Sequence, residues 1–328
     1  MSAPRNLEFY PDDRPSIARQ RRGRGYSYIA PDGTRIADLR ERKRLSALAV
    51  PPAWEGVWIS PKRNCHLQAT GRDIKTRKQY RYHHDWSALR ARKKFDHLLE
   101  FGEALPGLRR RVLRDLRNKE AGDHSFAIAA VIALIDRACL RIGSQTAVRE
   151  NRVYGATTLR RRHIDLDSNH IRLTYRAKGG QIVSKALQDK TLNTVFSSLD
   201  DLPGADLMTW VDDAGQPRTV TAGEVNAFLT DYLENDALTA KTFRTWNGTV
   251  SALQMVVSNE NPTIKDVAEA AAERLHNTPS IARSSYIHPH VIDLVSNRNA
   301  LPDFQNSDQI PGLRQTEARL IKLLRKET

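Results

Sequence analysis

Tyr286 closes a run of small polar residues that begins at Asn277, and basic residues stand at structured positions well before it in the chain. A phenol oxygen is a nucleophile that can attack a phosphate, while guanidinium and ammonium groups can neutralise phosphate charge. The sequence has no Gly-rich Walker loop, no His-Glu-x-x-His and no Gly-x-Ser-x-Gly. These residue types therefore indicate phosphate chemistry without a metal ion.

Taken singly, each of these residues has a commoner role. A tyrosine after Ser-Ser on a helix is usually an ordinary half-buried aromatic side chain. Arg141, which we place at the end of a buried helix, is more often a partner of the helix dipole than a catalyst. Lys178, between Ala177 and Gly179, reads as a solvated turn residue. No single residue decides between these roles.

The charge balance favours a polyanionic partner. The 52 lysines and arginines exceed the 38 aspartates and glutamates, which gives a formal net charge of +14. Residues 1–86 hold 18 basic and 9 acidic residues, so +9 of that charge lies there and +5 in the remainder. We expect the electrostatic footprint to be strongest at the N-terminal end.

The patterning predicts an α+β protein with a boundary near Trp86. Residues 1–86 contain short strand-like stretches at 26–30 and 56–60, separated by turn signals, which is typical of a small β-rich domain. A charged helix over 88–103 then opens a mostly helical domain, residues 87–328. We predict an apolar-striped helix at 125–142, ended by Gly143, and a second helix at 144–151.

The second domain is expected to contain one β-hairpin, with Lys178 at its tip between strands at 171–176 and 181–187. Thr221 and Glu224 form a capping box at the start of one of the helices that follow. We predict these helices at 191–199, 221–233, 241–257, 264–275, 291–296 and 317–326.

Neither a membrane span nor a metal site is expected. The longest apolar runs fall short of the roughly 20 residues that cross a bilayer, so we expect a soluble, cytoplasmic protein. Cys65 and Cys139 lack metal-ligand spacing, which makes a zinc site improbable. The His83-His84 and His288-Pro-His290 groups have no partner carboxylate at ligand spacing. We therefore predict no metal and no cofactor.

Several motifs follow one another in order along nearly the whole chain. They are Val50-Pro-Pro-Ala-Trp54, Val57-Trp-Ile-Ser-Pro61, Gln68-Ala-Thr-Gly-Arg-Asp73, Arg77-Lys-Gln-Tyr-Arg-Tyr-His83, Leu140-Arg-Ile-Gly143, Arg149-Glu-Asn151, Tyr154-Gly-Ala-Thr-Thr-Leu159, Ala177-Lys-Gly179, Lys241-Thr-Phe-Arg-Thr-Trp246, Asn277-Thr-Pro279 and Ser285-Tyr-Ile-His-Pro289. Together these motifs resemble those of the type IB DNA topoisomerases, in particular the short poxvirus-like bacterial members.

The resemblance implies an active site of five residues: Arg141, Lys178, Arg244, Asn277 and Tyr286. Many family members have histidine at the fourth position. An asparagine amide can still donate a neutral hydrogen bond to a phosphate oxygen, although it transfers no proton. His276 is the neighbouring alternative, but a one-residue shift turns a helical side chain by about 100°.

What the resemblance implies for activity is relaxation of supercoiled duplex DNA through a 3′-phosphotyrosyl bond to Tyr286, without ATP or metal. The protein would act as a nucleoid-associated monomer that closes round the duplex. The DNA-contacting residues implied in the N-terminal domain are Arg77, Lys78, Gln79, Tyr80, Arg81 and Tyr82. The alternative is that Tyr80 and Tyr82 face a β core.

Two rival functions are weighed against this one. Tyrosine recombinases use a similar set of residues, but their second arginine typically lies in a His-x-x-Arg motif, whereas this chain has Lys241-Thr-Phe-Arg244. A non-catalytic basic protein that coats DNA would explain the charge, yet it would leave the ordered motifs unexplained.

Overall fold

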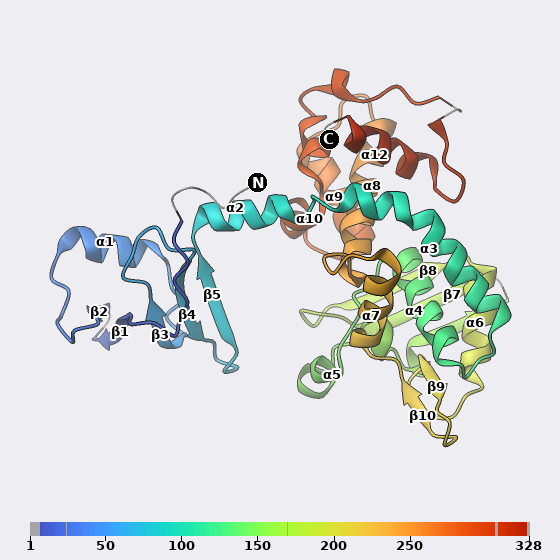
Figure 1. Ribbon diagram of the computed structural model, residues 1–328, viewed down its shortest axis with the longest axis horizontal. Coiled ribbons are helices and arrows are strands. Elements are labelled where there is room, and N and C mark those ends of the chain that lie inside the picture. The colour runs from blue at the N-terminus through green and yellow to red at the C-terminus, as the bar shows by residue number, and fades with distance from the viewer. Residues whose placement is uncertain (1–6, 24, 169, 306–307, 327–328) are drawn as a thin grey trace. The chain divides into compact units, whose positions relative to one another are not determined.

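The structure is a computed structural model that describes residues 7–23, 25–168, 170–305 and 308–326. The chain divides into two compact units, residues 1–94 and 95–328. In Figure 1 the first unit is coloured blue to cyan and the second cyan to red. The boundary expected near Trp86 falls inside the helix α2 (His84–Lys93), which is counted with the first unit.

The first unit is built on an antiparallel sheet of five strands in the order β2-β1-β3-β4-β5 (Figure 1). Leu45 of the helix α1 (Leu39–Ala47) packs against Ile17, Tyr28 and Ile59 of the sheet. β5 is an edge strand, so one side of its backbone is unpaired within the sheet. The strands are β1 (Ile17–Arg22), β2 (Gly25–Ile29), β3 (Glu55–Ile59), β4 (Leu67–Arg72) and β5 (Lys78–Tyr82).

The second unit is mostly helical and has one large apolar core. Two residues of α8, Phe243 and Trp246, pack edge-on against Phe101 of α3 in this core. The helices are α3 (Leu98–Asn118), α4 (His124–Ala138), α5 (Gln145–Asn151), α6 (Lys190–Asp200), α7 (Ala222–Leu233), α8 (Ala240–Ser258), α9 (Ile264–Leu275), α10 (Pro279–Tyr286), α11 (Pro289–Asp293) and α12 (Gln315–Arg325). The expected capping box of Thr221 and Glu224 is present at the start of α7.

The predicted hairpin is confirmed as β7 (His170–Arg176) and β8 (Ile182–Leu187). Gly179 and Gly180 adopt positive φ angles of 89° and 81° in its turn, a conformation that side chains other than glycine rarely adopt. β6 (Ile164–Asp167) adds a third strand. Short strands β9 (Thr209–Val211) and β10 (Pro217–Thr219) form a further pair that the sequence reading had missed.

Three helix predictions were wrong in their bounds. The helix expected over 291–296 is α11, which spans Pro289–Asp293. The helix expected over 88–103 is divided into α2 and α3. The helix expected over 125–142 ends at Ala138, because Cys139 takes a left-handed conformation (φ 57°) as its C-cap. Arg141 therefore lies in a loop rather than on a helix. None of the helices in the described ranges combines the length and apolarity needed to cross a membrane.

Candidate active site

Arg244 is fixed at the point where the C-terminal ends of two helices meet. Its side chain is carried by α8 and is only 3% exposed. One terminal nitrogen donates to the carbonyl of Cys139 at the end of α4, and the other donates to the carbonyl of Leu275 at the end of α9, at 2.9 Å. Its Nε is buried and has no hydrogen-bond partner among the described residues. This donor is therefore left unsatisfied beside the tyrosine described next.

Tyr286 is the last residue of α10 and lies against α8. Thr249 donates a hydrogen bond to the Tyr286 carbonyl at 3.1 Å. A Cβ atom at Gly248 would come within 2.9 Å of that carbonyl oxygen, so the two helices pack this closely because residue 248 is glycine. The guanidinium carbon of Arg244 lies 5.2 Å from the centre of the Tyr286 ring.

The phenol of Tyr286 is acidified by its surroundings. Burial alone raises its pKa, but the positive charge and hydrogen bond of Arg244, with the charges of Arg141 and Lys241, outweigh burial and bring the pKa below its usual value. Tyr175 is a useful comparison, because the same two arginines act on it. Burial dominates there and raises the pKa of Tyr175 to about 12. Of these two tyrosines, Tyr286 is the one whose pKa lies below its ordinary value.

Arg141 is positioned by a loop that two glycines allow to pack tightly. The Arg141 carbonyl accepts a hydrogen bond from Ala156 at 2.8 Å. A Cβ atom at Gly155 would come within 2.5 Å of that carbonyl oxygen and of the Gly143 nitrogen, which leaves no room for a larger residue. Burial, followed by the charge of Arg244, lowers the pKa of Arg141. The guanidinium nevertheless stays charged at neutral pH.

Asn277 joins this group through Arg141, whose Nη2 donates to the Asn277 side-chain oxygen. The Asn277 Nδ2 is buried and has no partner among the described residues. His276 caps α9 in a left-handed conformation, and its Nε2 is also buried without a partner there. Burial, followed by the charge of Lys185, lowers the pKa of His276, so its imidazole is neutral at neutral pH.

Of the five residues expected in the active site, Lys178 is the one that the structure does not bring to the others. It is exposed at the tip of the β7–β8 hairpin. The described residues include no hydrogen-bond or ion-pair partner for it. Arg141, Arg244, Asn277 and Tyr286 do come together.

Lys185 is a residue that the sequence reading missed. Its ammonium group donates to the carbonyls of Ala138 at 2.6 Å and Arg274 at 3.0 Å, each one residue before a carbonyl that Arg244 holds. Burial lowers the pKa of Lys185 to about 8. Strand alternation could have revealed it, because Lys185 shares a face of β8 with Val183, which is buried.

The six residues expected to contact DNA lie on β5 and directly before it, in the first unit. The alternative of a β core is wrong, since Tyr80 and Tyr82 are 46% and 36% exposed and stack on each other. Arg77 and Gln79 share one partner, Asp73, whose pKa the Arg77 guanidinium lowers to about 2. Lys78 forms an ion pair with Asp12, and Arg81 donates a hydrogen bond to the Ala49 carbonyl.

Comparisons with known proteins show the family of this chain. The family model described as "Eukaryotic DNA topoisomerase I, catalytic core" matches residues 83–283, and "Bacterial DNA topoisomerase IB, N-terminal domain" matches residues 25–73. This chain belongs to the type IB DNA topoisomerase family. The core match includes Arg141, Lys178, Arg244 and Asn277 but ends three residues before Tyr286. Neither match includes β5.

Two curated relatives extend the comparison. The chain is 26% identical to "DNA topoisomerase 1B" of Acanthamoeba polyphaga mimivirus over 95% of its own length and 96% of that protein. It is 24% identical to "DNA topoisomerase 1" of Mycosarcoma maydis over 57% of its length and 20% of that protein. The similarity to the viral protein therefore spans both units of this topoisomerase.

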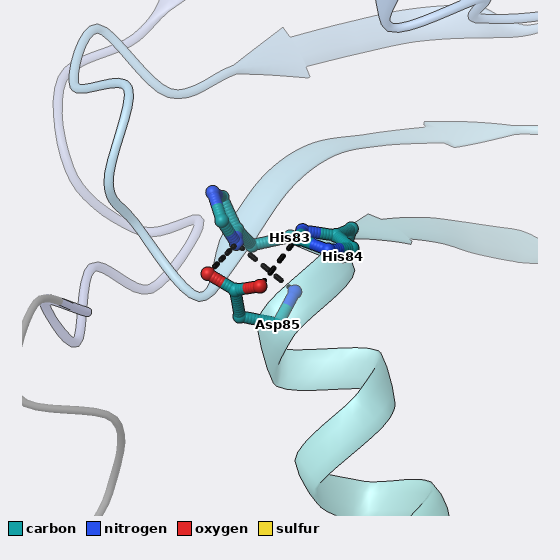
Figure 2. A group of neighbouring side chains, drawn as sticks. All are labelled: His83, His84 and Asp85. Carbon is teal, nitrogen blue, oxygen red and sulfur yellow. Dashed lines mark hydrogen bonds and ion pairs between the residues drawn. The ribbon is translucent and has the colours of Figure 1, made fainter.

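One premise of the metal prediction was wrong. His83 and His84 do have a carboxylate within reach, because Asp85 lies at the start of α2 beside both rings (Figure 2). For the other pair, burial lowers the pKa of His288 to about 4, and His288 accepts a hydrogen bond from the backbone of His290. The His83–His84–Asp85 group is thus the metal-ligand cluster found within the described residues.

Proposed function

We propose that this topoisomerase relaxes supercoiled duplex DNA by transient single-strand cleavage, with Tyr286 as the nucleophile and a 3′-phosphotyrosyl bond as the intermediate. The observation that carries the proposal is the position of the Tyr286 ring, whose centre lies 5.2 Å from the guanidinium carbon of Arg244. The charges of Arg244 and Arg141 act on its phenol and bring the pKa of Tyr286 below its usual value. A more acidic phenol has a larger phenolate fraction at neutral pH, and phenolate is the attacking form.

Arg141 and Arg244 would stabilise the transition state. As the tyrosine oxygen attacks, negative charge grows on the two non-bridging phosphate oxygens, and fixed guanidinium groups can bind that charge without reorganising. The buried Nε of Arg244 and Nδ2 of Asn277, which lack partners among the described residues, support this role. A phosphate oxygen would supply the missing acceptors after small adjustments of these side chains.

Lys178 would act as the general acid that protonates the departing 5′ oxygen. This role requires the hairpin tip to bring Lys178 to the scissile phosphate when DNA binds. Lys178→Ala should then slow cleavage, and a substrate with a better 5′ leaving group should largely restore the rate. If such a substrate gave no rescue, Lys178 would lose this role.

Resealing would reverse the first step. The phosphotyrosyl bond preserves the free energy of the phosphodiester, so attack by the free 5′ hydroxyl needs neither ATP nor a metal ion. Between the two steps the free end rotates and torsional strain is released. The six residues on β5 and directly before it, from Arg77 to Tyr82, would contact the backbone and bases of the duplex. We further propose that the enzyme acts as a monomer associated with the nucleoid.

The deciding experiment is plasmid relaxation by the purified chain with EDTA and without ATP. We expect relaxation, and a covalent protein–DNA adduct on denaturation. Tyr286→Phe should abolish both while leaving DNA binding near normal. The matched control is Tyr232→Phe, a half-buried tyrosine of α7 that lies outside the site. Normal relaxation by Tyr286→Phe would overturn the proposal.

The second candidate function is site-specific recombination, which the shared set of catalytic residues favours. The same preparation distinguishes the two functions. Exchange of strands between two specific sites, with no relaxation of a plasmid that lacks them, would establish a recombinase. A protein that binds DNA but forms no adduct would be a non-catalytic coating protein.

A further inference from the structure

Three consecutive side chains at the start of α2 converge on one point (Figure 2). His83 follows β5 by one residue, and His84 and Asp85 are the first two residues of α2. The Nδ1 atom of His84 lies 2.8 Å from one carboxylate oxygen of Asp85, and the Nδ1 atom of His83 lies 3.6 Å from the other. The three candidate ligand atoms all lie within 4.8 Å of one another.

These separations suit a small cation. Two nitrogen or oxygen ligands at about 2.1 Å from a tetrahedral zinc ion lie about 3.4 Å apart. The two measured separations bracket that value, so modest rotations of the side chains would complete the geometry. Two imidazoles and one carboxylate favour borderline first-row ions such as Zn²⁺ over Mg²⁺ and Ca²⁺, which prefer oxygen ligands.

The local hydrogen bonding leaves Nδ1 of His83 able to act as a ligand. The backbone N–H of Asp85 donates to Nδ1 of His83 at 3.2 Å, which places a lone pair on that nitrogen. An arriving ion would replace this hydrogen bond. It would also replace the direct contact between Nδ1 of His84 and the Asp85 carboxylate. The His84 side chain is 87% exposed and that of Asp85 is 47% exposed, so the ion can enter directly from solvent.

We propose that His83, His84 and Asp85 bind one transition-metal ion of borderline softness, for which Zn²⁺ is the probe. The site lies in the first unit and goes beyond the proposed metal-free strand cleavage. Bound metal would fix the turn that leads from β5 into α2. The positive end of the helix dipole opposes a cation here by about fivefold in affinity at most, and Asp85 offsets that effect. With three protein ligands and no enclosing cage, we expect a dissociation constant of order 1–10 µM.

The test is isothermal titration of the tag-free full-length chain with ZnCl₂ and separately with MgCl₂. We expect one zinc site in the micromolar range and no magnesium binding there. His84→Ala should weaken zinc binding at least tenfold, and its exposed side chain makes misfolding a minor concern. Asp85→Asn, which keeps the shape of the residue, should give a similar loss.

The control variant is His124→Ala, which removes another histidine paired with a carboxylate, here Glu224 at 2.9 Å. It should leave the micromolar site intact. Unchanged zinc affinity in both His84→Ala and Asp85→Asn would overturn the proposal, as would loss of the site in His124→Ala or the absence of zinc binding to the wild type.

Hydrogen exchange gives a second readout that does not depend on strand cleavage. Zn²⁺ should slow exchange of the first amides of α2 in the wild type and not in His84→Ala. Equal exchange with and without Zn²⁺ at saturation would show that the ion is held elsewhere. Because neither measurement uses DNA relaxation, failure of the metal site and failure of the proposed function remain distinguishable.

Discussion

Two groups of arginines in the second unit differ in how their charge is balanced. Arg109 and Arg314 both bind Glu317, and Arg109 also pairs with Asp136. We call these four residues the paired network. Arg141 and Arg244 instead contact backbone carbonyls, an amide and a tyrosine, and no carboxylate among the described residues pairs with them. The same residue type thus appears once neutralised within the protein and once left for an external anion.

The paired network also holds the segment of α8 that follows Arg244 in the active site. Trp246 donates to Glu317 at 3.2 Å, and Arg314 donates to the side chain of Asn247 at 3.2 Å. Both contacted residues follow Arg244 closely on α8. Asp136, at the other side of the network, lies near the end of α4, where the chain leads to Arg141. Internal pairing therefore appears where structure is fixed, and unpaired charge appears where a phosphate would bind.

The largest expected effect is on stability, from breaking the paired network. Glu317→Gln leaves Arg314 without a carboxylate partner and Arg109 with only Asp136. Loss of one partner of a buried ion pair costs about 3–5 kcal/mol, so urea unfolding of the second unit should shift by that amount at pH 7. Glu103→Gln, at an exposed ion pair with Arg325, should cost less than about 1 kcal/mol.

The stability difference between the wild type and Glu317→Gln should also depend on pH, in a direction set by the pKa of Glu317. The Arg109 and Arg314 partners hold the pKa of Glu317 well below its ordinary value of 4.5, despite burial, which raises it. A depressed carboxyl pKa contributes stability above the unfolded value and loses it as pH falls. The difference between wild type and Glu317→Gln should therefore be full at pH 7 and shrink below about pH 4.5. A constant difference down to pH 3 would contradict this assignment.

The unpaired group should show the opposite balance, a large effect on rate and a small one on stability. Arg141→Ala removes one donor to the transition state, which typically costs about 10²–10³ in rate. Single-turnover cleavage of a DNA duplex measures this loss, while urea unfolding should change by less than about 1 kcal/mol. Arg117→Ala, at an exposed position of α3, is the control for charge alone. If Arg141→Ala lost as much stability as Glu317→Gln, the contrast between the paired network and the unpaired arginines would be wrong.

Local patterns in the sequence predicted most elements, but not the end of α4. The apolar stripe continues past Ala138 to Ile142, and Gly143 looked like the residue that ends the helix. The actual cap is Cys139, a non-glycine residue in a left-handed conformation, and Gly143 serves a close approach to Gly155 instead. Contacts between segments that are distant in the sequence determine where α4 ends and what Gly143 does. Local sequence patterns do not record such contacts.

Prediction of the active site from the sequence was limited in the same way. Motif order named Arg141, Arg244, Asn277 and Tyr286, and these residues do meet in the structure. The carbonyls that hold Arg244 could not be read from the sequence, because they belong to the ends of α4 and α9. For Lys185, strand alternation could have indicated its half-buried position. Its partners, the carbonyls of Ala138 and Arg274, leave no signature in residue types.

The ammonium group of Lys185 donates to two backbone carbonyls, and its burial should lower the free energy of unfolding while it is charged. Its pKa is lowered from 10.5 to about 8, so the folded state disfavours its charged form. That cost is present below pH 8 and disappears as pH rises from 8 to 10.5, which should stabilise the protein by up to about 3 kcal/mol. Urea unfolding between pH 7 and 10.5 should show this rise in the wild type relative to Lys185→Met. The exposed Lys190→Met should behave like the wild type, and a flat difference for Lys185→Met would contradict the burial of its charge.

The smallest expected effect concerns Asn277, where many family members have histidine. Asn277→Ala removes one neutral hydrogen bond to the phosphate, worth about 1 kcal/mol, so cleavage should slow by about fivefold. Asn277→His should change the rate by less than that, because the neighbouring arginines would keep the new imidazole neutral and leave it as a neutral donor, as the amide is. His276→Ala is the matched control, and cleavage at a rate near that of the wild type is expected. If His276→Ala slowed cleavage more than Asn277→Ala, the unsatisfied Nε2 of His276 would be the phosphate donor, and the fourth position of the site would move by one residue.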